Sequence, residues 1–141
     1  MANEFPSHPD RRPAIVTGAS SGIGAATATA LSAAGFPVVL AARRVDRLEE
    51  LAKVIRANDG EVAVVRLDVT DDESVGAAFA AAQQAMGDIE IVVSNAGDMV
   101  PAPAESADTA TFLRQLDTNL VGAHRLVIEG LAPMKIGRAH V

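Results

Sequence analysis

Cysteine, tyrosine and tryptophan are absent from this sequence of 141 residues, and lysine occurs only as Lys53 and Lys135. Without cysteine the chain can form no disulfide and no thiolate metal site, a composition that agrees with the cytoplasm, where we expect the protein. The three histidines, His8, His124 and His140, are far apart and lack the spacing of metal ligands. We therefore expect no metal site.

Long hydrophobic runs and an excess of positive charge are also missing. No apolar run is long enough to cross a bilayer, and the stretch MANEFPSHPDRRP lacks the apolar segment of a signal peptide, so we expect no membrane partner. The net charge of −6 argues against a nucleic-acid partner. A hydrophobic content of 49% with 21% charged residues is typical of one soluble globular domain.

Short apolar runs alternate with helical patterns along residues 13–134, the region that we expect to fold. The pattern predicts strands at 14–17, 36–43, 61–69 and 89–97, and helices at 22–34, 47–58, up to 86, and from 106 or 108 toward 131. As helix caps we expect Asp46, then Thr70 or Asp71, then Ser106 or Asp108, with Gly35, Gly60 and Gly87 at the helix ends. Residues 1–12 are expected to be a flexible tail, and 135–141 a tail of uncertain structure.

Strict alternation of strands and helices indicates an α/β fold with a parallel sheet. Right-handed crossovers would give the strand order 3-2-1-4 with helices on both faces, which is a partial, three-layer, doubly wound sheet of Rossmann-like type. The first and fourth strands then lie side by side although they are not consecutive. The crevice between their carboxyl ends is the expected ligand site.

The stretch PAIVTGASSGIGAATATAL places a glycine-rich turn between the first strand and its helix. Backbone N–H groups and the helix dipole at such a turn attract phosphate. We expect Gly18 to allow the tight turn, Gly22 to let a ligand approach the backbone, and Gly24 to let the helix pack on the sheet. Ser20 and Ser21 add hydroxyl groups, and Ile23 completes the segment. A nucleoside-triphosphate loop is a poor alternative, because its Lys-Ser/Thr is replaced by 25–26, Ala-Ala.

Four motifs in order carry a resemblance: TGASSGIG at 17–24, LDVT at 67–70, SNAG at 94–97 and TNLVG at 118–122. Together they resemble the N-terminal half of the short-chain dehydrogenase/reductase family. The resemblance covers about residues 13–134 and implies an NAD(P)-binding domain. It also implies hydride transfer between the cofactor and a small carbonyl or alcohol substrate, and a homo-oligomeric full-length enzyme.

By the same resemblance, Asp68 matches the residue whose carboxylate meets the adenine amino group, with Val69 beside the ring. The alternative for Asp68 is a cap of the following helix, a role that Asp71 could equally fill. Asn95, Ala96 and Gly97 match the turn that shapes the adenine and ribose side of the crevice. Its alternative is a plain strand-to-helix turn, and the first Asn of the family pattern is replaced by a serine here.

The end of the second strand bears on the choice between NAD and NADP. NAD-binding members carry an acidic residue there, whereas this sequence has Ala42 followed by Arg43 and Arg44. A guanidinium pairs well with a 2′-phosphate, so we expect NADP, with NAD less favoured. The alternative is that the two arginines are solvated or pair with Glu49 and Glu50.

The resemblance assigns an auxiliary role to Asn119, which would support a water in the family's proton relay. Leu116, Leu120 and Ala123 place it on an apolar helical face, where a buried amide needs partners. The alternative is a polar residue that is hydrogen-bonded locally and takes no part in chemistry.

The family's chemistry uses a Tyr-x-x-x-Lys pair and a serine from the second half of the domain. Because the sequence contains no tyrosine, we expect this chain to be inactive. The segment GRAHV either begins a fifth strand or belongs to a frameshift. We expect a partial form of an NADP-dependent oxidoreductase, with a non-catalytic nucleotide-binding module or a nonfunctional truncated product as alternatives.

Overall fold

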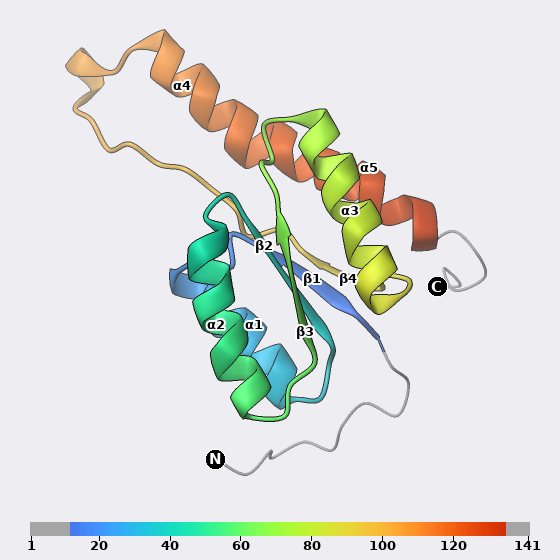
Figure 1. The fold of residues 1–141 in the computed structure, drawn as a ribbon. Helices are drawn as coiled ribbons and strands as arrows, with labels where there is room; N and C mark the ends of the chain where they lie inside the picture. Colours follow the sequence, from blue (N-terminus) through green and yellow to red (C-terminus); the bar gives the residue numbers. More distant parts are fainter. Residues whose placement is uncertain (1–11, 135–141) are drawn as a thin grey trace.

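The computed structural model of the chain describes residues 12–134 (Figure 1). The elements follow in the order β1 (Ala14–Thr17), α1 (Gly22–Ala33), β2 (Val38–Ala42), α2 (Val45–Ala57), β3 (Val62–Arg66), α3 (Asp72–Met86), β4 (Ile91–Val93), η1 (Ala104–Ser106), α4 (Thr109–Leu116), η2 (Asp117–Val121) and α5 (Gly122–Met134). The two expected tails lie outside the described residues, except for Arg12. The Arg12 Nε donates to Glu90 Oε2 at 3.0 Å.

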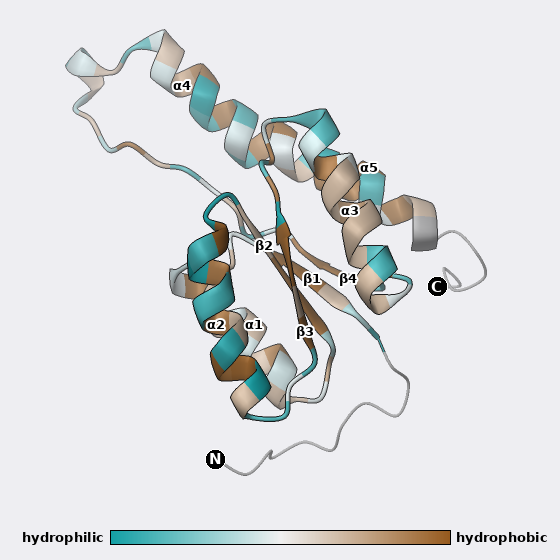
Figure 2. Cartoon of the chain, in the orientation of Figure 1, coloured by the Kyte–Doolittle hydropathy of each residue, from teal (hydrophilic) through white to brown (hydrophobic). Residues whose placement is uncertain are grey.

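The four strands form a parallel sheet in the order β3-β2-β1-β4, which confirms the predicted topology. Figure 1 shows α1 and α2 on one face of the sheet and α3 and α5 on the other, with α4 extending beyond it. Alternate strand residues serve the two faces: Val16 and Leu40 pack toward α1 and α2, whereas Ile15 and Val39 pack toward α3 and α5. The sheet is therefore doubly wound, and its strands are the most hydrophobic part of the molecule (Figure 2).

β1 has the predicted bounds, whereas β2, β3 and β4 are shorter than predicted, and backbone chemistry explains two of the ends. Pro37 has no N–H to donate, so the ladder of β2 begins at Val38, whose N–H donates to Glu61 O at 3.0 Å. After β4 the Asn95 N–H turns toward Thr17 Oγ1 at 3.0 Å instead of continuing the ladder. The predicted residues beyond these points are turns and loops.

The helix caps were predicted correctly in part. Asp71 caps α3 by accepting from Glu73 N and Ser74 N, and Asp108 caps α4 by accepting from Thr111 N. The prediction that Asp46 caps α2 is wrong: the helix starts earlier, with Arg44 at the cap position and Asp46 in the first turn. An acidic residue stabilises a helix start from either position, because both lie at the positive end of the helix dipole.

The last predicted helix is divided into three parts. A π-helical turn, η2, separates α4 from α5, and helical structure continues to Met134 rather than ending near 131. The expectation of a buried face around Asn119 is wrong for the described residues, because Asn119 is exposed and Leu120 is 64% exposed. No helix between residues 12 and 134 has the length and apolar character that a membrane span requires.

Candidate functional site

A cleft of about 740 Å³ opens at the carboxyl ends of the strands. This size is suitable for a small-molecule or cofactor ligand. Its wall contains twelve of the predicted site residues: Gly18, Ser20, Ser21, Gly22, Ile23, Arg43, Arg44, Asp68, Val69, Asn95, Ala96 and Gly97. Gly24 and Asn119, which were also predicted, are not part of the wall. They contact residues of the wall from the side that faces away from the cleft. The fold thus brings four separate sequence motifs to one cleft.

The turn between β1 and α1 has the geometry of an anion cradle. Gly18 and Gly22 have φ values of 66° and 56°, in the left-handed region that glycine adopts without strain. Ser21 occupies the cap position of α1 with extended backbone, and its side chain makes no capping hydrogen bond. The N–H groups of the first helical turn therefore lack a side-chain cap within residues 12–134 and are available to a phosphate oxygen.

Gly24 lies one helical turn into α1, where the helix approaches the end of β1. A Cβ at this position would overlap the carbonyl oxygen of Gly18 and would lie 2.6 Å from Asn95 Nδ2. The absence of a side chain at Gly24 thus lets α1 pack close to β1 and β4. This agrees with the packing role expected for it.

Thr17 was not predicted as a site residue, although it joins the two strands that form the crevice. Its hydroxyl donates to Val93 O at 3.1 Å and accepts from Asn95 N at 3.0 Å and Ala96 N at 3.1 Å. Asn95 Nδ2 in turn donates to Thr17 O at 3.1 Å. A fully buried polar residue at the end of the apolar run AIVT was the signal that could have revealed this joint.

Asp68 is placed in the wall by a short turn of its own. Its Oδ1 accepts from Thr70 N at 3.0 Å and from Thr70 Oγ1 at 2.7 Å. The Thr70 side-chain and backbone hydrogen bonds lower the pKa of Asp68, with smaller contributions from Arg43 and Arg66. The alternative of Asp68 as the helix cap is not what the structure shows, because Asp71 caps α3. Asp68 therefore presents an ionised carboxylate at the cleft.

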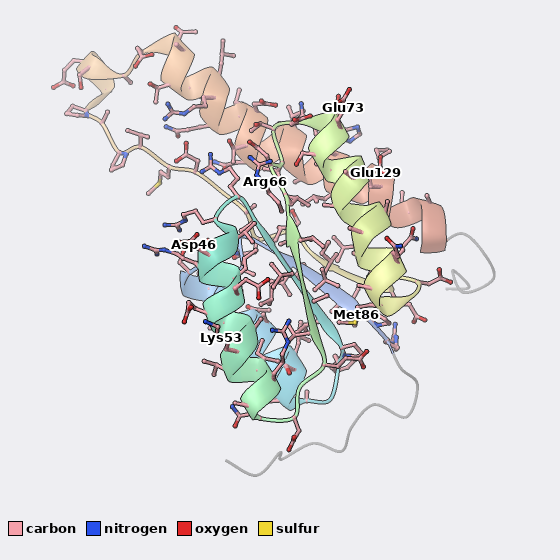
Figure 3. All side chains as sticks on the ribbon, in the orientation of Figure 1. Asp46, Lys53, Arg66, Glu73, Met86 and Glu129 are labelled. Carbon is pink, nitrogen blue, oxygen red and sulfur yellow. The ribbon has the colours of Figure 1, made fainter. Side chains whose placement is uncertain are left out.

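The two arginines after β2 are placed at the cleft instead of pairing with the glutamates of α2. Arg44 Nη2 donates to Ser20 Oγ at 3.3 Å, across the cleft wall. Glu49 lies 3.8 Å from Arg56, and Glu50 lies 2.8 Å from Lys53. Lys53 is further along α2 than Asp46, away from the end of the sheet where Arg66 terminates β3 (Figure 3).

Asn119 fastens the wall that follows β4. Its Oδ1 accepts from Asp98 N and its Nδ2 donates to Asp98 O, both at 2.7 Å. The partner is 21 residues away, so the amide links η2 to the loop after Gly97 and is not bonded within its own helix, as the alternative to the relay role had it.

Six further wall residues were not predicted as site residues, although Ala42, Leu67, Thr70 and Thr118 lie in segments that the sequence analysis used; the other two are Asp98 and Arg114. Arg114 and Thr118 are four residues apart, so they share one helical side, and that spacing was an available signal. Arg114 Nε also lies 3.4 Å from Asp98 Oδ2. Within residues 12–134 no group of three or more His, Asp or Glu side chains is placed to hold a metal ion.

Comparisons with known proteins agree with this geometry. A family model described as short chain dehydrogenase matches residues 12–140. An uncharacterized oxidoreductase of Listeria monocytogenes is 38% identical over 118 residues, covering 84% of this chain and 46% of that protein. Farnesol dehydrogenase of Aedes aegypti is 40% identical over 111 residues, covering 77% and 45%. The chain therefore spans about half the length of the curated relatives that it matches.

Solved structures show the same arrangement. Actinorhodin polyketide ketoreductase with NADPH superposes with a TM-score of 0.84 at 29% identity, over 90% of this chain and 49% of that one. An alcohol dehydrogenase of the archaeon Thermococcus sibiricus, complexed with 5-hydroxy-NADP, gives a TM-score of 0.84 at 35% identity, over 89% and 54%. With its matching motifs, sheet order and cleft, the chain belongs to the short chain dehydrogenase family.

Proposed function

We propose that this chain forms the NADP-binding part of an oxidoreductase that transfers hydride between NADP(H) and a small carbonyl or alcohol substrate. The observation that carries the choice of NADP is the wall after β2, where Ala42 is followed by Arg43 and Arg44. An acidic side chain at that point would repel a 2′-phosphate, whereas a guanidinium can bind it with two charge-assisted hydrogen bonds.

The wall offers a complementary group for each part of the cofactor. The N–H groups at the start of α1 and the hydroxyls of Ser20 and Ser21 would hold the pyrophosphate. Asp68 would accept from the adenine amino group, and Val69 would contact the ring. When bound, the nicotinamide supplies or accepts the hydride. The chain's own residues orient it by fixing the other end of the molecule.

Titration of NADPH and NADH tests this proposal. We expect NADPH to bind more tightly by about 1–3 kcal/mol, the range for a hydrogen bond to a charged group. Arg43→Asp should abolish that preference. Arg47→Asp is the matched control, because it makes the same change of charge on α2 at a residue outside the cleft wall. Equal affinities in the parent chain, or an unchanged preference in Arg43→Asp, would contradict the proposal.

We also propose that the 141-residue chain binds the cofactor without turnover. Hydride delivery to a ketone builds negative charge on oxygen and needs a proton donor within hydrogen-bond reach. The sequence has no tyrosine for that role, and Asn119 is occupied by the Asp98 backbone. NADPH absorbance followed with a panel of ketones and aldehydes should give the rate without enzyme. A faster rate that is lost in Asn119→Ala would show a different active site.

The location, oligomeric state and partners of the full-length enzyme form part of the same proposal. We propose a cytoplasmic full-length enzyme that acts as a homo-oligomer on a small-molecule substrate, without a nucleic-acid or membrane partner. Exposed apolar residues along α4 to α5, among them Phe112, Leu120 and Ile128, support association. Size-exclusion chromatography with light scattering tests the proposed homo-oligomer, and a monomer at every concentration would count against it.

A further inference from the structure

Arg125, on α5, makes a set of contacts that the proposed binding function does not use. Its side chain is only 18% exposed. Nη1 donates to Val69 O at 2.9 Å and to Asp117 Oδ1 at 2.9 Å, and Nε donates to Asp72 Oδ1 at 2.6 Å. One guanidinium therefore joins the loop after β3 to η2 and to the first turn of α3.

The contact with Val69 O connects Arg125 to the cleft. Val69 is part of the wall, whereas Arg125 is not. Behind Val69 lies Gly122, the first residue of α5, where a Cβ would be 2.8 Å from Val69 Cγ2. The side chain of Val69 is thus backed by the helix, and its carbonyl is fixed by the guanidinium of the same helix.

At the start of this loop the Leu67 N–H donates to Ala42 O at 3.0 Å, which ties it to the end of β2. The residues that follow bond nearby in the sequence: Asp68 accepts from Thr70 through its carboxylate, and the Asp68 N–H donates to Ser74 Oγ at 2.9 Å. These bonds fix the internal shape of the turn at 68–70 and link it to the start of α3. The hydrogen bond from Arg125 to Val69 O links this turn to α5.

The two carboxylates around Arg125 have different surroundings. Asp72 is 85% exposed, so water screens its attraction and the pair adds little. Asp117 is 41% exposed and accepts from Nη1, the same nitrogen whose other N–H donates to Val69 O, so it helps to orient the group that holds the loop. Asp117 lies in the π-helical turn η2, as does Asn119, which holds the opposite wall through Asp98. The π-helical turn η2 therefore makes hydrogen bonds toward both walls of the cleft, to Asp98 through Asn119 and to Val69 through Asp117 and Arg125.

We propose that Arg125 is a positioning residue for the adenine side of the cleft: through Val69 O it sets where Asp68 and Val69 meet the adenine ring. This inference rests on the proposed NADP-binding function. The proposed roles of Arg125 and Arg43 differ in the part of the cofactor that each residue affects. Arg43 would act on the 2′-phosphate and therefore on NADPH alone, whereas Arg125 would act on the adenine and therefore on NADPH and NADH equally.

The test is calorimetric titration of the full chain with NADPH, NADH and inorganic pyrophosphate. Arg125→Met keeps the aliphatic length and removes every donor, and we expect both dinucleotides to bind about tenfold more weakly, with their ratio unchanged. Pyrophosphate reports on the glycine-rich turn alone, so its affinity should not change. Arg125→Lys can supply one donor direction only and should weaken both dinucleotides about threefold. Arg56→Met, an exposed pair partner on α2, is the control and should bind all three as the parent does.

Each result decides the inference. Equal weakening of both dinucleotides with retained pyrophosphate binding supports it. Unchanged binding by Arg125→Met overturns it, as does a parallel loss of pyrophosphate affinity with a lower melting temperature, which would show general damage to the fold. If Arg125→Met does not fold, Asp117→Asn takes its place with the same criteria and an expected loss of about threefold. Failure of the parent chain to bind NADPH would overturn the proposed function, and this inference with it.

Discussion

The centre of the sheet and the C-terminal helical stretch differ in how their apolar side chains are covered. Every residue of β1 and β2 is buried, whereas the three residues of β4 are half-buried at the edge of the sheet. Among residues 12–134, ten of the twelve exposed large hydrophobic residues lie between Met99 and Leu131: Met99, Val100, Phe112, Leu113, Leu116, Leu120, Val121, Val127, Ile128 and Leu131. The central strands are thus covered by the described residues, whereas many apolar side chains of the C-terminal helical stretch are not.

The cleft has walls in both regions, and this division shows which part of the site is rigid. The glycine-rich turn follows β1, which is paired on both sides, whereas Asp68 follows β3, the other edge strand, which packs against α2 and α3. The wall of Gly97 and Asp98 follows the edge strand and is held by Asn119 from an exposed helix. The proposed phosphate-binding turn is thus supported by the core of the sheet, while the opposite wall depends on two hydrogen bonds to a helical stretch that is itself less covered.

The largest expected effect on the free energy of unfolding comes from making the same substitution, Leu→Ala, once in each of the two regions. Leu40 in β2 is fully buried, whereas Leu120 in η2 is 64% exposed. We expect Leu40→Ala to lower the free energy of unfolding by about 2–5 kcal/mol, through lost burial and the cavity that remains. Leu120→Ala should change it by less than about 0.5 kcal/mol. Denaturant unfolding followed by circular dichroism measures both, and equal losses would refute the contrast.

The packing of α1 on the sheet gives a second test, with a glycine pair. Gly24→Ala introduces a Cβ that overlaps Gly18 O, so we expect a loss of about 3 kcal/mol and weaker NADPH binding. Gly76 lies in α3, and a Cβ there would meet only Glu129 Oε1 at 3.9 Å. Gly76→Ala should therefore stabilise the chain by about 0.5–1 kcal/mol, because alanine is the better helix residue. Thermal unfolding of both variants would show opposite signs, and a stable Gly24→Ala would contradict the close approach.

The joint between β1 and β4 gives a third test. Thr17→Val removes the buried hydroxyl that accepts from Asn95 N and Ala96 N, leaving these half-buried donors without that partner. We expect a loss of about 1–3 kcal/mol. Thr29 is exposed and donates only to Ala25 O in its own helix, so Thr29→Val should have little effect. Hydrogen exchange at the amides of 95 and 96 would localise the damage, and no faster exchange in Thr17→Val would exclude this role.

The sheet order could be predicted from the alternation of strands and helices with right-handed crossovers, and the glycine-rich turn from its place after the first strand. The wall residues Asp68, Val69 and 95–97 were predicted from the resemblance to the family. Apolar runs, glycines at turns and caps such as Asp71 determine the structure of residues close to them in the sequence.

The contacts that the sequence did not predict join distant segments, as Thr17 with Asn95 and Asn119 with Asp98. The π-helical turn was also missed, since no local signal in residues 117–121 distinguishes it from an α-helix.

The smallest expected effect is the pH dependence of the free energy of unfolding. It is tested by comparing a carboxylate of the packed region with one of the exposed region. Hydrogen bonds from Thr70 lower the pKa of Asp68, and hydrogen bonds from Thr111 lower the pKa of Asp108. A lowered folded pKa means that each carboxylate stabilises the fold above its ordinary pKa of 3.8, and that this contribution is lost as the pH falls through the lowered value. For Asp68 we expect a contribution below about 1 kcal/mol, because water screens a partly exposed group.

The measurement is the free energy of unfolding of the parent, Asp68→Asn and Asp108→Asn between pH 7 and pH 2. Asparagine keeps the acceptor oxygen and removes the charge, so the deficit of each variant should be constant near neutral pH and should shrink below about pH 4. Only Asp68→Asn should also weaken NADPH binding at pH 7, because Asp68 lines the cleft and Asp108 caps a helix away from it. A deficit that grows as the pH falls would reverse the sign of the coupling. Equal effects of the two variants on NADPH would remove Asp68 from the binding wall.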